Sequence, residues 1–266
     1  MEYIVFVGIS FFASVIGCIC GIGGGVLIKP VMDAFQLYPV STVSFMSGCI
    51  VLSMTAYSVL KSVVSHDSKI EKGISTWLGL GAALGGVFGK QLFEAVKAAA
   101  SEPNAVGAVQ SVALLLVTMA TVVFTLNKSR MNTRRVHTPV PCAIIGLVLG
   151  LISAFLGIGG GPLNLVVLYY FASMDTKTAA QNSLYIILLS QLASLIYSII
   201  GGTVPELPVL LFIMMVLCGI LGGVVGRRIN RHINAGTVNW LFIVLMFVIM
   251  LICCYNFTQY TGVLFT

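Results

Sequence analysis

Long apolar runs alternate with short polar loops along the chain. The apolar segments are 3–20, 25–37, 41–60, 73–92, 108–127, 139–156, 160–172, 178–200, 207–226 and 238–257. Several of them approach or exceed the roughly 20 residues that a helix needs to cross a bilayer. We therefore predict an all-α polytopic membrane protein, in which segment 93–107 is an amphipathic connector lying in the membrane interface.

Glycines interrupt the apolar pattern at two places. The stretch CGIGGGVLIKP (Cys20–Pro30) is echoed by LGIGGGPLNLV (Leu156–Val166), so that GIGGG recurs 136 positions later. Backbone polar groups cannot stay unpaired in lipid, so a broken helix there must be buried in protein or line a wet cavity. Glycine permits positive φ angles, and Pro162 suits the start of a following helix. We predict that each GIGGG is the turn of a helical hairpin; the alternative is that these glycines only permit tight helix packing.

A second internal repeat supports a two-part chain. LGGVFGKQL (Leu84–Leu92) corresponds to LGGVVGRRI (Leu221–Ile229). Internal repeats of this kind are common in secondary transporters. We predict two structural repeats, each made of a glycine-turned helical hairpin and three transmembrane helices. The predicted divisions are 1–127 for the first repeat, 128–138 for a cytoplasmic linker and 139–266 for the second repeat.

The basic residues predict the orientation of the two repeats. If each hairpin returns to the side from which it entered, one side collects eleven lysines and arginines, and the other side keeps only Lys90 and Lys97. The eleven are Lys61, Lys69, Lys72, Lys128, Arg130, Arg134, Arg135, Lys177, Arg227, Arg228 and Arg231. The positive-inside rule then predicts inverted repeats, a cytoplasmic linker and both termini outside. Eight simple crossings would divide the charges seven against six and predict no orientation.

Composition supports the membrane assignment. The chain is 58% hydrophobic and 8% charged, with a mean hydropathy of +1.05, whereas soluble domains carry about 25% charged residues. The net charge of +6 comes from loops between spans, which favours a lipid bilayer and excludes nucleic acid as the partner. We expect a multi-pass protein of the inner cell membrane. The seven cysteines have no zinc-type spacing, so we expect buried free thiols and no metal or cofactor.

The glycine turns also predict a binding site. The helix that follows each turn presents free N–H groups and the positive end of its dipole, which together favour an anion. Lys29, an ionisable residue inside a hairpin, is a functional candidate with Asp33 as its expected partner; the alternative is that it snorkels to an interface. Ser47 and Ser183 correspond at the 136-residue offset and offer uncharged donors, or else simple interhelical hydrogen bonds. The predicted substrate-binding residues are Gly23, Gly24, Gly25, Lys29, Ser47, Gly159, Gly160, Gly161, Asn164, Gln181, Asn182 and Ser183.

The repeated glycine motif resembles the signature of the TauE/SafE sulfite-exporter family, also called the TSUP permeases. That signature has the form G-x-G-G-G-x-x-x-x-P. Gly21, Gly23, Gly24, Gly25 and Pro30 match its first copy, and Gly157, Gly159, Gly160 and Gly161 match its second. Val166 replaces the second proline, while TKTAAQNSL (Thr176–Leu184) also resembles a stretch of the family.

The resemblance implies a membrane permease for a small sulfur-containing anion, such as sulfite, thiosulfate or an organosulfonate. Transport by alternating access, coupled to H⁺ or Na⁺, is the expectation for this class. Two other readings remain open: a passive anion channel on the same fold, and a membrane enzyme that uses Cys18 or Cys20. The residues do not define the direction of transport or the oligomeric state.

Overall fold

The computed structural model describes residues 2–99, 103–131, 133–134 and 138–264, and its regular elements in these ranges are all helices. The helices are α1 (Glu2–Cys20), α2 (Gly25–Phe35), α3 (Val40–Val64), α4 (Lys72–Ala99), α5 (Pro103–Asn127), the 3₁₀ helix η1 (Lys128–Arg130), α6 (Pro139–Leu156), α7 (Gly161–Ala172), α8 (Thr176–Ile200), α9 (Val209–His232) and α10 (Ala235–Leu264). No strand occurs in the described ranges, so the predicted all-α class is confirmed. Arg135, one of the predicted cytoplasmic charges, lies outside them.

Seven of the described helices are long and apolar enough to cross a membrane: α1, α3, α5, α6, α8, α9 and α10. Helix α4 is as long as these, with 28 residues, but falls outside the apolar set. The two helices that follow the glycine turns are short, with 11 residues in α2 and 12 in α7. The chain is a multi-pass membrane protein.

The predicted connector at 93–107 is wrong. Residues 93–99 continue α4, and residues 103–107 already belong to α5, with 100–102 outside the described ranges. Phe93 and Val106 are buried, at 5% and 3% exposure. These two side chains thus pack against protein, whereas Ala95, Ala98 and Ala99 are exposed.

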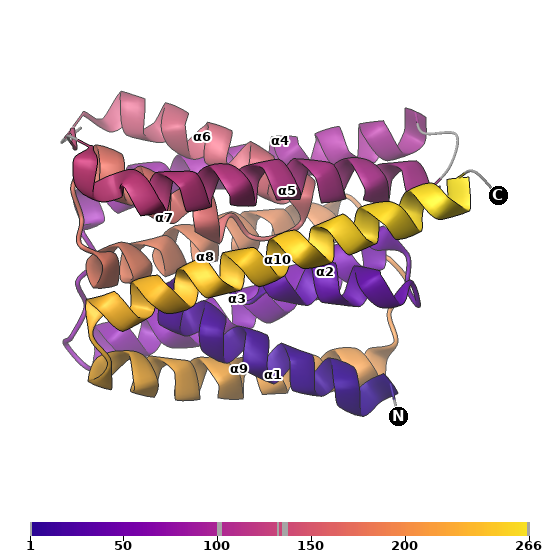
Figure 1. Cartoon of the computed structure of the whole chain (residues 1–266), viewed down its shortest axis with the longest axis horizontal. Helices are drawn as coiled ribbons and strands as arrows, with labels where there is room; N and C mark the ends of the chain where they lie inside the picture. The colour runs from indigo at the N-terminus through magenta and orange to yellow at the C-terminus, as the bar shows by residue number, and fades with distance from the viewer. Residues whose placement is uncertain (1, 100–102, 132, 135–137, 265–266) are drawn as a thin grey trace.

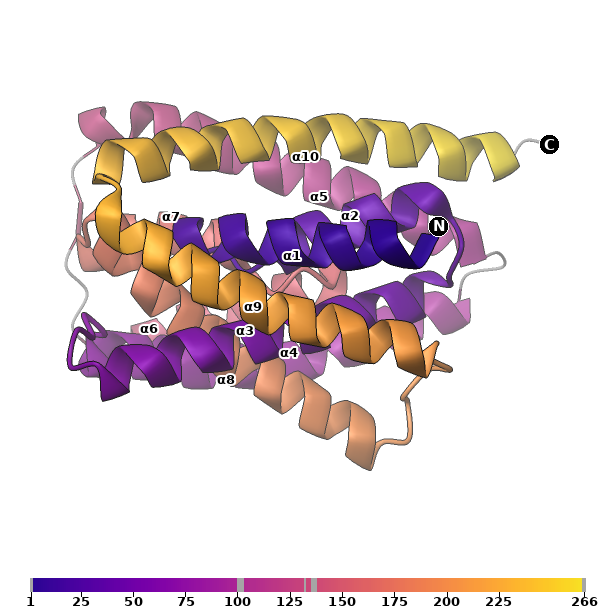
Figure 2. The same cartoon turned by 90° about the horizontal axis from the view of Figure 1, so that it is seen from below.

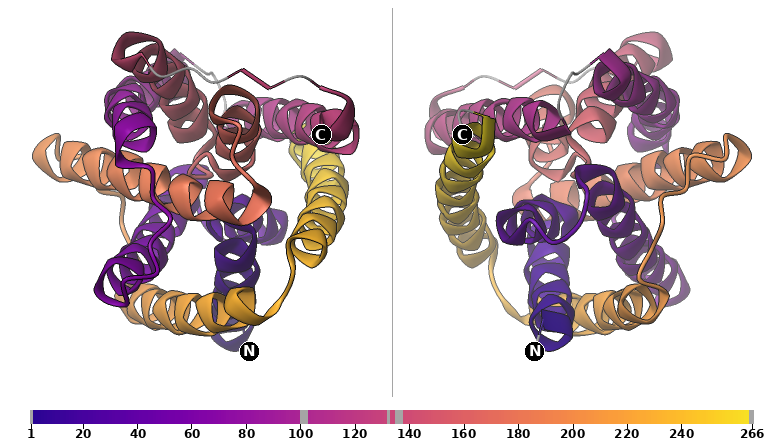
Figure 3. Two further views of the ribbon diagram at one scale, coloured as in Figure 1. Left: turned by 90° about the vertical axis from the view of Figure 1, so that its left-hand side faces the viewer. Right: turned by 90° about the vertical axis from the view of Figure 1, so that its right-hand side faces the viewer.

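The long helices run broadly along one axis of the molecule (Figure 1). The described ends of the chain, at the start of α1 and the end of α10, lie at one end of this axis, which we call the terminal end (Figures 1 and 2). Helix η1 and the α3–α4 and α9–α10 connections lie at the opposite end, which we call the linker end. Viewed end-on, α5 packs beside α10 and α4 beside α6 (Figure 3).

Glycines bring helix backbones into direct contact. A Cβ atom at Gly85 of α4 would lie 2.0 Å from the carbonyl oxygen of Leu147 in α6, and one at Gly150 would lie 2.1 Å from that of Ala82. A Cβ at Gly226 of α9 would lie 2.5 Å from the carbonyl oxygen of Val15 in α1. Small residues at such crossings are typical of membrane helices. Close packing between backbones therefore occurs at these helix crossings as well as at the glycine turns.

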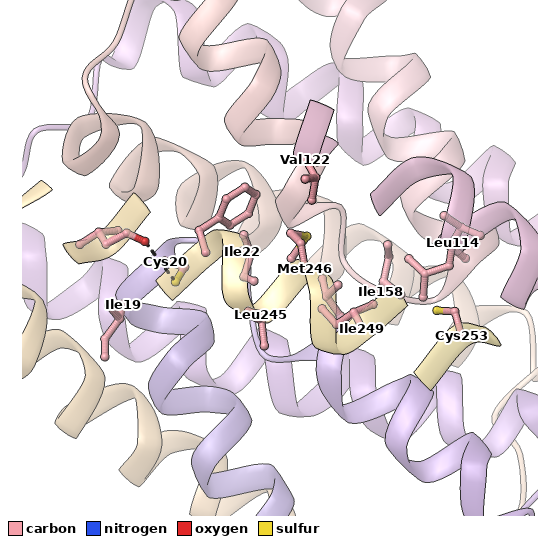
Figure 4. Close-up of a cluster of buried hydrophobic side chains, with 14 residues drawn as sticks. Ile19, Cys20, Ile22, Leu114, Val122, Ile158, Leu245, Met246, Ile249 and Cys253 are labelled. Carbon is pink, nitrogen blue, oxygen red and sulfur yellow. Dashed lines mark hydrogen bonds between the residues drawn. The ribbon is translucent and has the colours of Figure 1, made fainter. Parts of the chain in front are cut away.

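The isoleucine inside each GIGGG anchors its turn. Ile22 and Ile158 are each 1% exposed and belong to one hydrophobic cluster with side chains of α5 and α10. Figure 4 shows both of them beside Met246 and Ile249 of α10. Burying a large aliphatic side chain contributes about 1.5–3 kcal/mol, so these two side chains help to hold the non-helical backbone in place.

Candidate functional site

The helices break at both glycine turns, as the sequence predicts. In the first turn Gly21 and Gly23 have φ angles of +77° and +71°. In the second turn the φ angles are +69° at Gly157, +77° at Gly159 and +81° at Gly160. Residues with a Cβ rarely adopt these values. Neither following helix has a side-chain cap, and Pro162 begins α7 where a missing N–H costs nothing.

The two turns pack against each other at the centre of the protein. A Cβ at Gly161 would lie 1.8 Å from the carbonyl oxygen of Ile22, and one at Gly25 would lie 3.0 Å from that of Ile158. A Cβ on Gly159 would meet Val51 at 3.4 Å and Ile187 at 3.7 Å, while one on Gly23 would meet Val51 at 3.0 Å. We call these two turns, with Val51 and Ile187, the central barrier.

A polar pocket lies on the terminal-end side of the central barrier. It encloses about 690 Å³ of empty space, counting its open mouth. We call it the Lys90 pocket. Its lining is Ser41, Ser44, Phe45, Gly48, Cys49, Lys90, Phe93, Glu94, Gln110, Ala154, Gly157, Gln191, Ser194, Leu195, Thr203 and Pro205. It therefore runs from the α8–α9 connection down to Gly157 in the second glycine turn.

Lys90 supplies positive charge to this pocket. Its half-buried side chain donates hydrogen bonds to Ser198 Oγ and, at 3.5 Å, to the carbonyl oxygen of Ser194. The ammonium also lies 5.4 Å from the centroid of the Phe45 ring. No ion pair to Lys90 occurs among the described residues; Glu94, which also lines the pocket, pairs with Lys97 at 3.8 Å instead.

Hydroxyl and amide groups surround the Lys90 ammonium. The hydroxyl oxygens of Ser44 and Ser194 and the amide oxygen of Gln110 are buried without a hydrogen-bond partner in the described part of the chain. Gln191 adds a further amide to the same wall. The Ser44 and Ser194 hydroxyls can donate hydrogen bonds to an anion beside Lys90, whereas the Gln110 amide nitrogen already donates to the Phe155 carbonyl oxygen.

A smaller pocket, which we call the Arg227 pocket, lies on the linker-end side of the barrier. It holds about 350 Å³ of empty space and is lined by Cys18, Ser58, Asp67, Ala180, Gln181, Leu184, Arg227, Asn230 and Arg231. Arg227 donates to the carbonyl oxygen of Ser58 at 3.0 Å and to Asp67 Oδ1 at 2.5 Å, and Arg231 donates to Asp67 Oδ2. Burial acts to raise the pKa of Asp67, but hydrogen bonds from Arg231 and Arg227 hold it below its ordinary value. The carboxyl is therefore ionised at neutral pH.

Lys29 lies buried in the first hairpin and pairs with Asp33. The two side chains, at 4% and 6% exposure, are 2.7 Å apart. The expected partner is confirmed, and the alternative in which Lys29 snorkels to an interface is wrong. A Cβ at Gly157 would lie 3.0 Å from Lys29 Cε, so the lysine stem packs against the floor of the Lys90 pocket while Asp33 balances its charge.

Asn182 and Gln181 hold the α3–α4 connection rather than a glycine turn. Asn182 Oδ1 accepts hydrogen bonds from Glu71 N at 2.8 Å and from Ser75 Oγ at 2.6 Å. Its Nδ2 donates to the Lys69 carbonyl oxygen at 2.9 Å and to a carbonyl one turn earlier in α8 at 2.8 Å. Gln181 Oε1 accepts from Lys69 N at 2.9 Å. The Asn182 amide therefore has no donor or acceptor left for a substrate in this conformation.

The other predicted residues surround the central barrier. Ser47 Oγ donates to the Gly25 carbonyl oxygen at 3.5 Å, and Asn164 Oδ1 would lie 3.6 Å from a Cβ on Gly160. Ser183 is fully buried, and its hydroxyl has no partner in the described ranges. The structure thus places Ser47 beside the first turn and Asn164 beside the second. Their binding roles, and those of Gly23, Gly24, Gly25, Gly159, Gly160, Gly161 and Ser183, stay predictions.

Lys90, Gln110 and Ser44 line the Lys90 pocket but are not among the binding residues predicted from the sequence, where Lys90 is only a charge beside a span. A signal was present, because Lys90 and Arg227 are the basic residues at the same position of the repeated LGGV motif, and each lines one of the two pockets.

The cysteines are free thiols in the structure. Cys18 Sγ lies 3.5 Å from Ser58 Oγ, and Cys20 Sγ lies 4.0 Å from the Val238 carbonyl oxygen within the hydrophobic cluster. The expected burial holds for both, whereas Cys254 is exposed. The described residues contain no group of histidine, cysteine and acidic side chains that could hold a metal ion.

Comparison with known families decides the class of the protein. The family model described as sulfite exporter TauE/SafE matches residues 6–252, which include both glycine turns and the lining of both pockets. The chain belongs to the sulfite exporter TauE/SafE family. Members of the TauE/SafE family are membrane permeases rather than enzymes, so the resemblance read from the glycine motif is confirmed. Comparisons with curated proteins and with solved structures give no match.

Proposed function

We propose that this TauE/SafE family member is a secondary transporter that moves a small sulfur-containing anion across the inner cell membrane by alternating access. The observation that carries the proposal is the Lys90 pocket, whose lining runs from the α8–α9 connection at the terminal end to Gly157 in the packed glycine turns. A site reached from one end and blocked from the other is the arrangement that a carrier needs. A passive channel would need an open path through the central barrier.

The chemistry of the pocket supports a sulfur oxyanion. Sulfite, thiosulfate and sulfonates each present several acceptor oxygens around a compact negative charge. The Lys90 ammonium supplies a charge-assisted hydrogen bond, while Ser44, Gln110 and Gln191 line the same space. The neutralised Lys29–Asp33 pair adds no net charge beside it.

We further propose that segments 1–127 and 139–266 are inverted repeats joined by a cytoplasmic linker at 128–138. In support, the order of a helix, a glycine turn, a short helix and three longer helices occurs twice. Helices α1 and α6 begin at opposite ends of the molecule (Figure 1). Many of the basic loop residues belong to connections at the linker end, which supports a cytoplasmic position for that end and an outside position for both termini.

The decisive experiment removes the charge of Lys90 and measures uptake into proteoliposomes. We expect Lys90→Gln to weaken the apparent affinity for the transported anion by roughly ten- to a hundredfold, because a hydrogen bond to a charged group contributes about 1.5–3 kcal/mol. The matched control is Lys97→Gln, which removes the same charge from an exposed position in the same helix. Lys90→Arg, which keeps the charge, should retain part of the affinity. Unchanged affinity in Lys90→Gln would remove this pocket from the pathway.

The same liposomes decide between a carrier and a channel. Sulfite, thiosulfate, isethionate and sulfoacetate are tested with sulfate and chloride as comparison anions, with and without pH and Na⁺ gradients. Saturable uptake that responds to one of these gradients supports the carrier and identifies the coupling ion. Large single-channel currents would support a passive anion channel instead.

A further inference from the structure

The Lys90 and Arg227 pockets are built from corresponding positions of the two halves. Lys90 and Arg227 share one position of the repeated LGGV motif. Lys90 donates to the Ser194 carbonyl oxygen at 3.5 Å, and Arg227 donates to that of Ser58 at 3.0 Å. Ser58 and Ser194 are separated by the same 136 positions as the two glycine turns. The same pair of basic side chain and helix carbonyl therefore occurs on each side of the barrier.

The floors of the two pockets correspond in the same way. In the Lys90 pocket, a Cβ at Gly157 would lie 2.7 Å from Ser44 Oγ. On the other side of the barrier, a Cβ at Gly21 would lie 2.3 Å from Cα of Ala180, the counterpart of Ser44 at the 136-residue offset. Ala180 lines the Arg227 pocket. Gly157 thus lines the Lys90 pocket directly, and Gly21 packs against Ala180 in the lining of the Arg227 pocket.

One difference separates the pockets. Lys90 has no carboxylate partner in the described ranges, whereas both oxygens of Asp67 accept hydrogen bonds from Arg227 and Arg231. Asp67 belongs to the α3–α4 connection, which Gln181 and Asn182 hold against the start of α8. The Asp67 carboxylate therefore extends into the Arg227 pocket from a short polar connection that side-chain hydrogen bonds hold against α8.

We propose that the Arg227 pocket is a second binding site for the transported sulfur oxyanion, and that the Asp67 carboxylate occupies it in this conformation. The proposal rests on the proposed transport function. A carboxylate and a sulfur oxyanion offer the same ligand chemistry to a guanidinium, namely paired acceptor oxygens carrying negative charge. When Asp67 withdraws, two arginines are left without their counter-charge, and an anion that crosses the barrier takes its place.

In this proposal, the group bound to Arg227, either Asp67 or an anion, is linked to which end of the protein is accessible. In this conformation Asp67 is paired with both arginines, whereas Lys90 has no carboxylate partner in the described ranges. In the opposite conformation we expect Asp67 to leave the arginines and the Lys90 side to close. Competition between Asp67 and the anion for Arg227 would bias the equilibrium between the two states, because a ligand shifts such an equilibrium only by its differential affinity.

The test uses Cys18, which lines the Arg227 pocket and is 4% exposed. The full chain, with its other cysteines replaced by alanine, is placed in nanodiscs and labelled with a membrane-impermeant maleimide. We expect Asp67→Asn to raise the labelling rate of Cys18 by about tenfold or more, since the rate follows the population of the open form. Glu71→Gln is the matched control, because it removes the same charge from the same loop, and we expect no change from it.

Anion binding is then read as protection from labelling. The probes are isethionate and, separately, sulfate, neither of which reacts with a maleimide. We expect a millimolar concentration of at least one of them to slow labelling of Asp67→Asn several-fold, and we expect no protection in Asp67→Asn/Arg227→Gln. The control Asp67→Asn/Arg228→Gln, which removes the neighbouring exposed arginine, should keep the protection.

Each outcome tests the second binding site separately from the proposed transport function. Labelling that is unchanged in Asp67→Asn overturns the role of Asp67, and exposure without protection by either anion overturns the second site. Uptake that depends on Lys90 while protection is absent would leave the transport function standing and remove only this site. Protection that depends on Arg227, in a protein that transports no sulfur anion, would leave an anion site and remove the transport function.

Discussion

Lys29, Lys90 and Arg227 all carry a positive charge, but each interacts with a different set of neighbouring groups. Lys29 is buried and fully balanced by Asp33 at 2.7 Å. Lys90 faces a pocket with hydroxyl and carbonyl acceptors and no ion pair in the described ranges. Arg227 shares Asp67 with Arg231. The first charge is balanced within a hairpin, the second has no carboxylate partner in the described ranges, and the third is held by an internal carboxylate.

The buried pair at Lys29 gives a prediction about stability. Lys29→Met leaves the Asp33 carboxylate uncompensated, which we expect to destabilise the fold by about 3–5 kcal/mol. Lys29→Met/Asp33→Asn should recover much of that loss, because no isolated charge remains. The readout is thermal unfolding of the purified protein in detergent. Lys61→Met, at an exposed lysine in α3, serves as the control, and a single mutant as stable as the unmodified protein would contradict the argument.

At the scale of the element, the glycine turns differ from the helices they interrupt. Each turn is held by positive φ angles, by a buried isoleucine and by close backbone contact with the other turn. The long helices also extend beyond the apolar runs: α3 continues to Val64 and α4 to Ala99. The connector predicted at 93–107 is wrong because α4 continues to Ala99 and α5 already begins at Pro103.

Gly161 provides a test of the turns. A Cβ there would lie 1.8 Å from the Ile22 carbonyl oxygen, and backbone on both sides leaves nothing flexible to move. Overpacking typically costs about 1–3 kcal/mol or more, so we expect Gly161→Ala to lower the melting temperature and the yield of monodisperse protein. Gly8→Ala, at a position with no atom within 4 Å of the new methyl group, should do neither. Equal behaviour of the two variants would show that the turns do not need this contact.

For the whole molecule, the central barrier lies between two pockets lined by residues on its terminal-end and linker-end sides. The larger one reaches the α8–α9 connection at the terminal end, and the smaller one has Asp67 paired with Arg227 in its lining. This asymmetry between corresponding halves is what alternating access requires of a single conformation. The proposed inversion of the repeats would let the same halves exchange these roles in the opposite state.

The orientation of the molecule is tested with two introduced cysteines in a cysteine-free background. Val204 and Ser65 are exposed residues of the α8–α9 and α3–α4 connections, which lie at the terminal end and the linker end respectively. We expect an impermeant maleimide to label Val204→Cys in intact bacterial spheroplasts and Ser65→Cys in inverted vesicles, because the basic loops keep the linker end inside. Labelling of Ser65→Cys in spheroplasts would reverse the orientation, and labelling of both from one side would contradict the proposed repeats.

The sequence by itself determined the helical membrane class, the two breaks at Gly21–Gly25 and Gly157–Gly161, and the family. These features are local, because apolar run length, glycine content and motif spacing act within one segment of the chain. Only the tertiary structure decided which polar groups meet. Asp67 accepts a hydrogen bond from Arg227, and Asn182 is hydrogen-bonded to the backbone of Lys69 and Glu71. Lys90 lines a pocket formed by several helices. Such pairings depend on which helices pack side by side and at what depth, and no periodicity within a single helix records that.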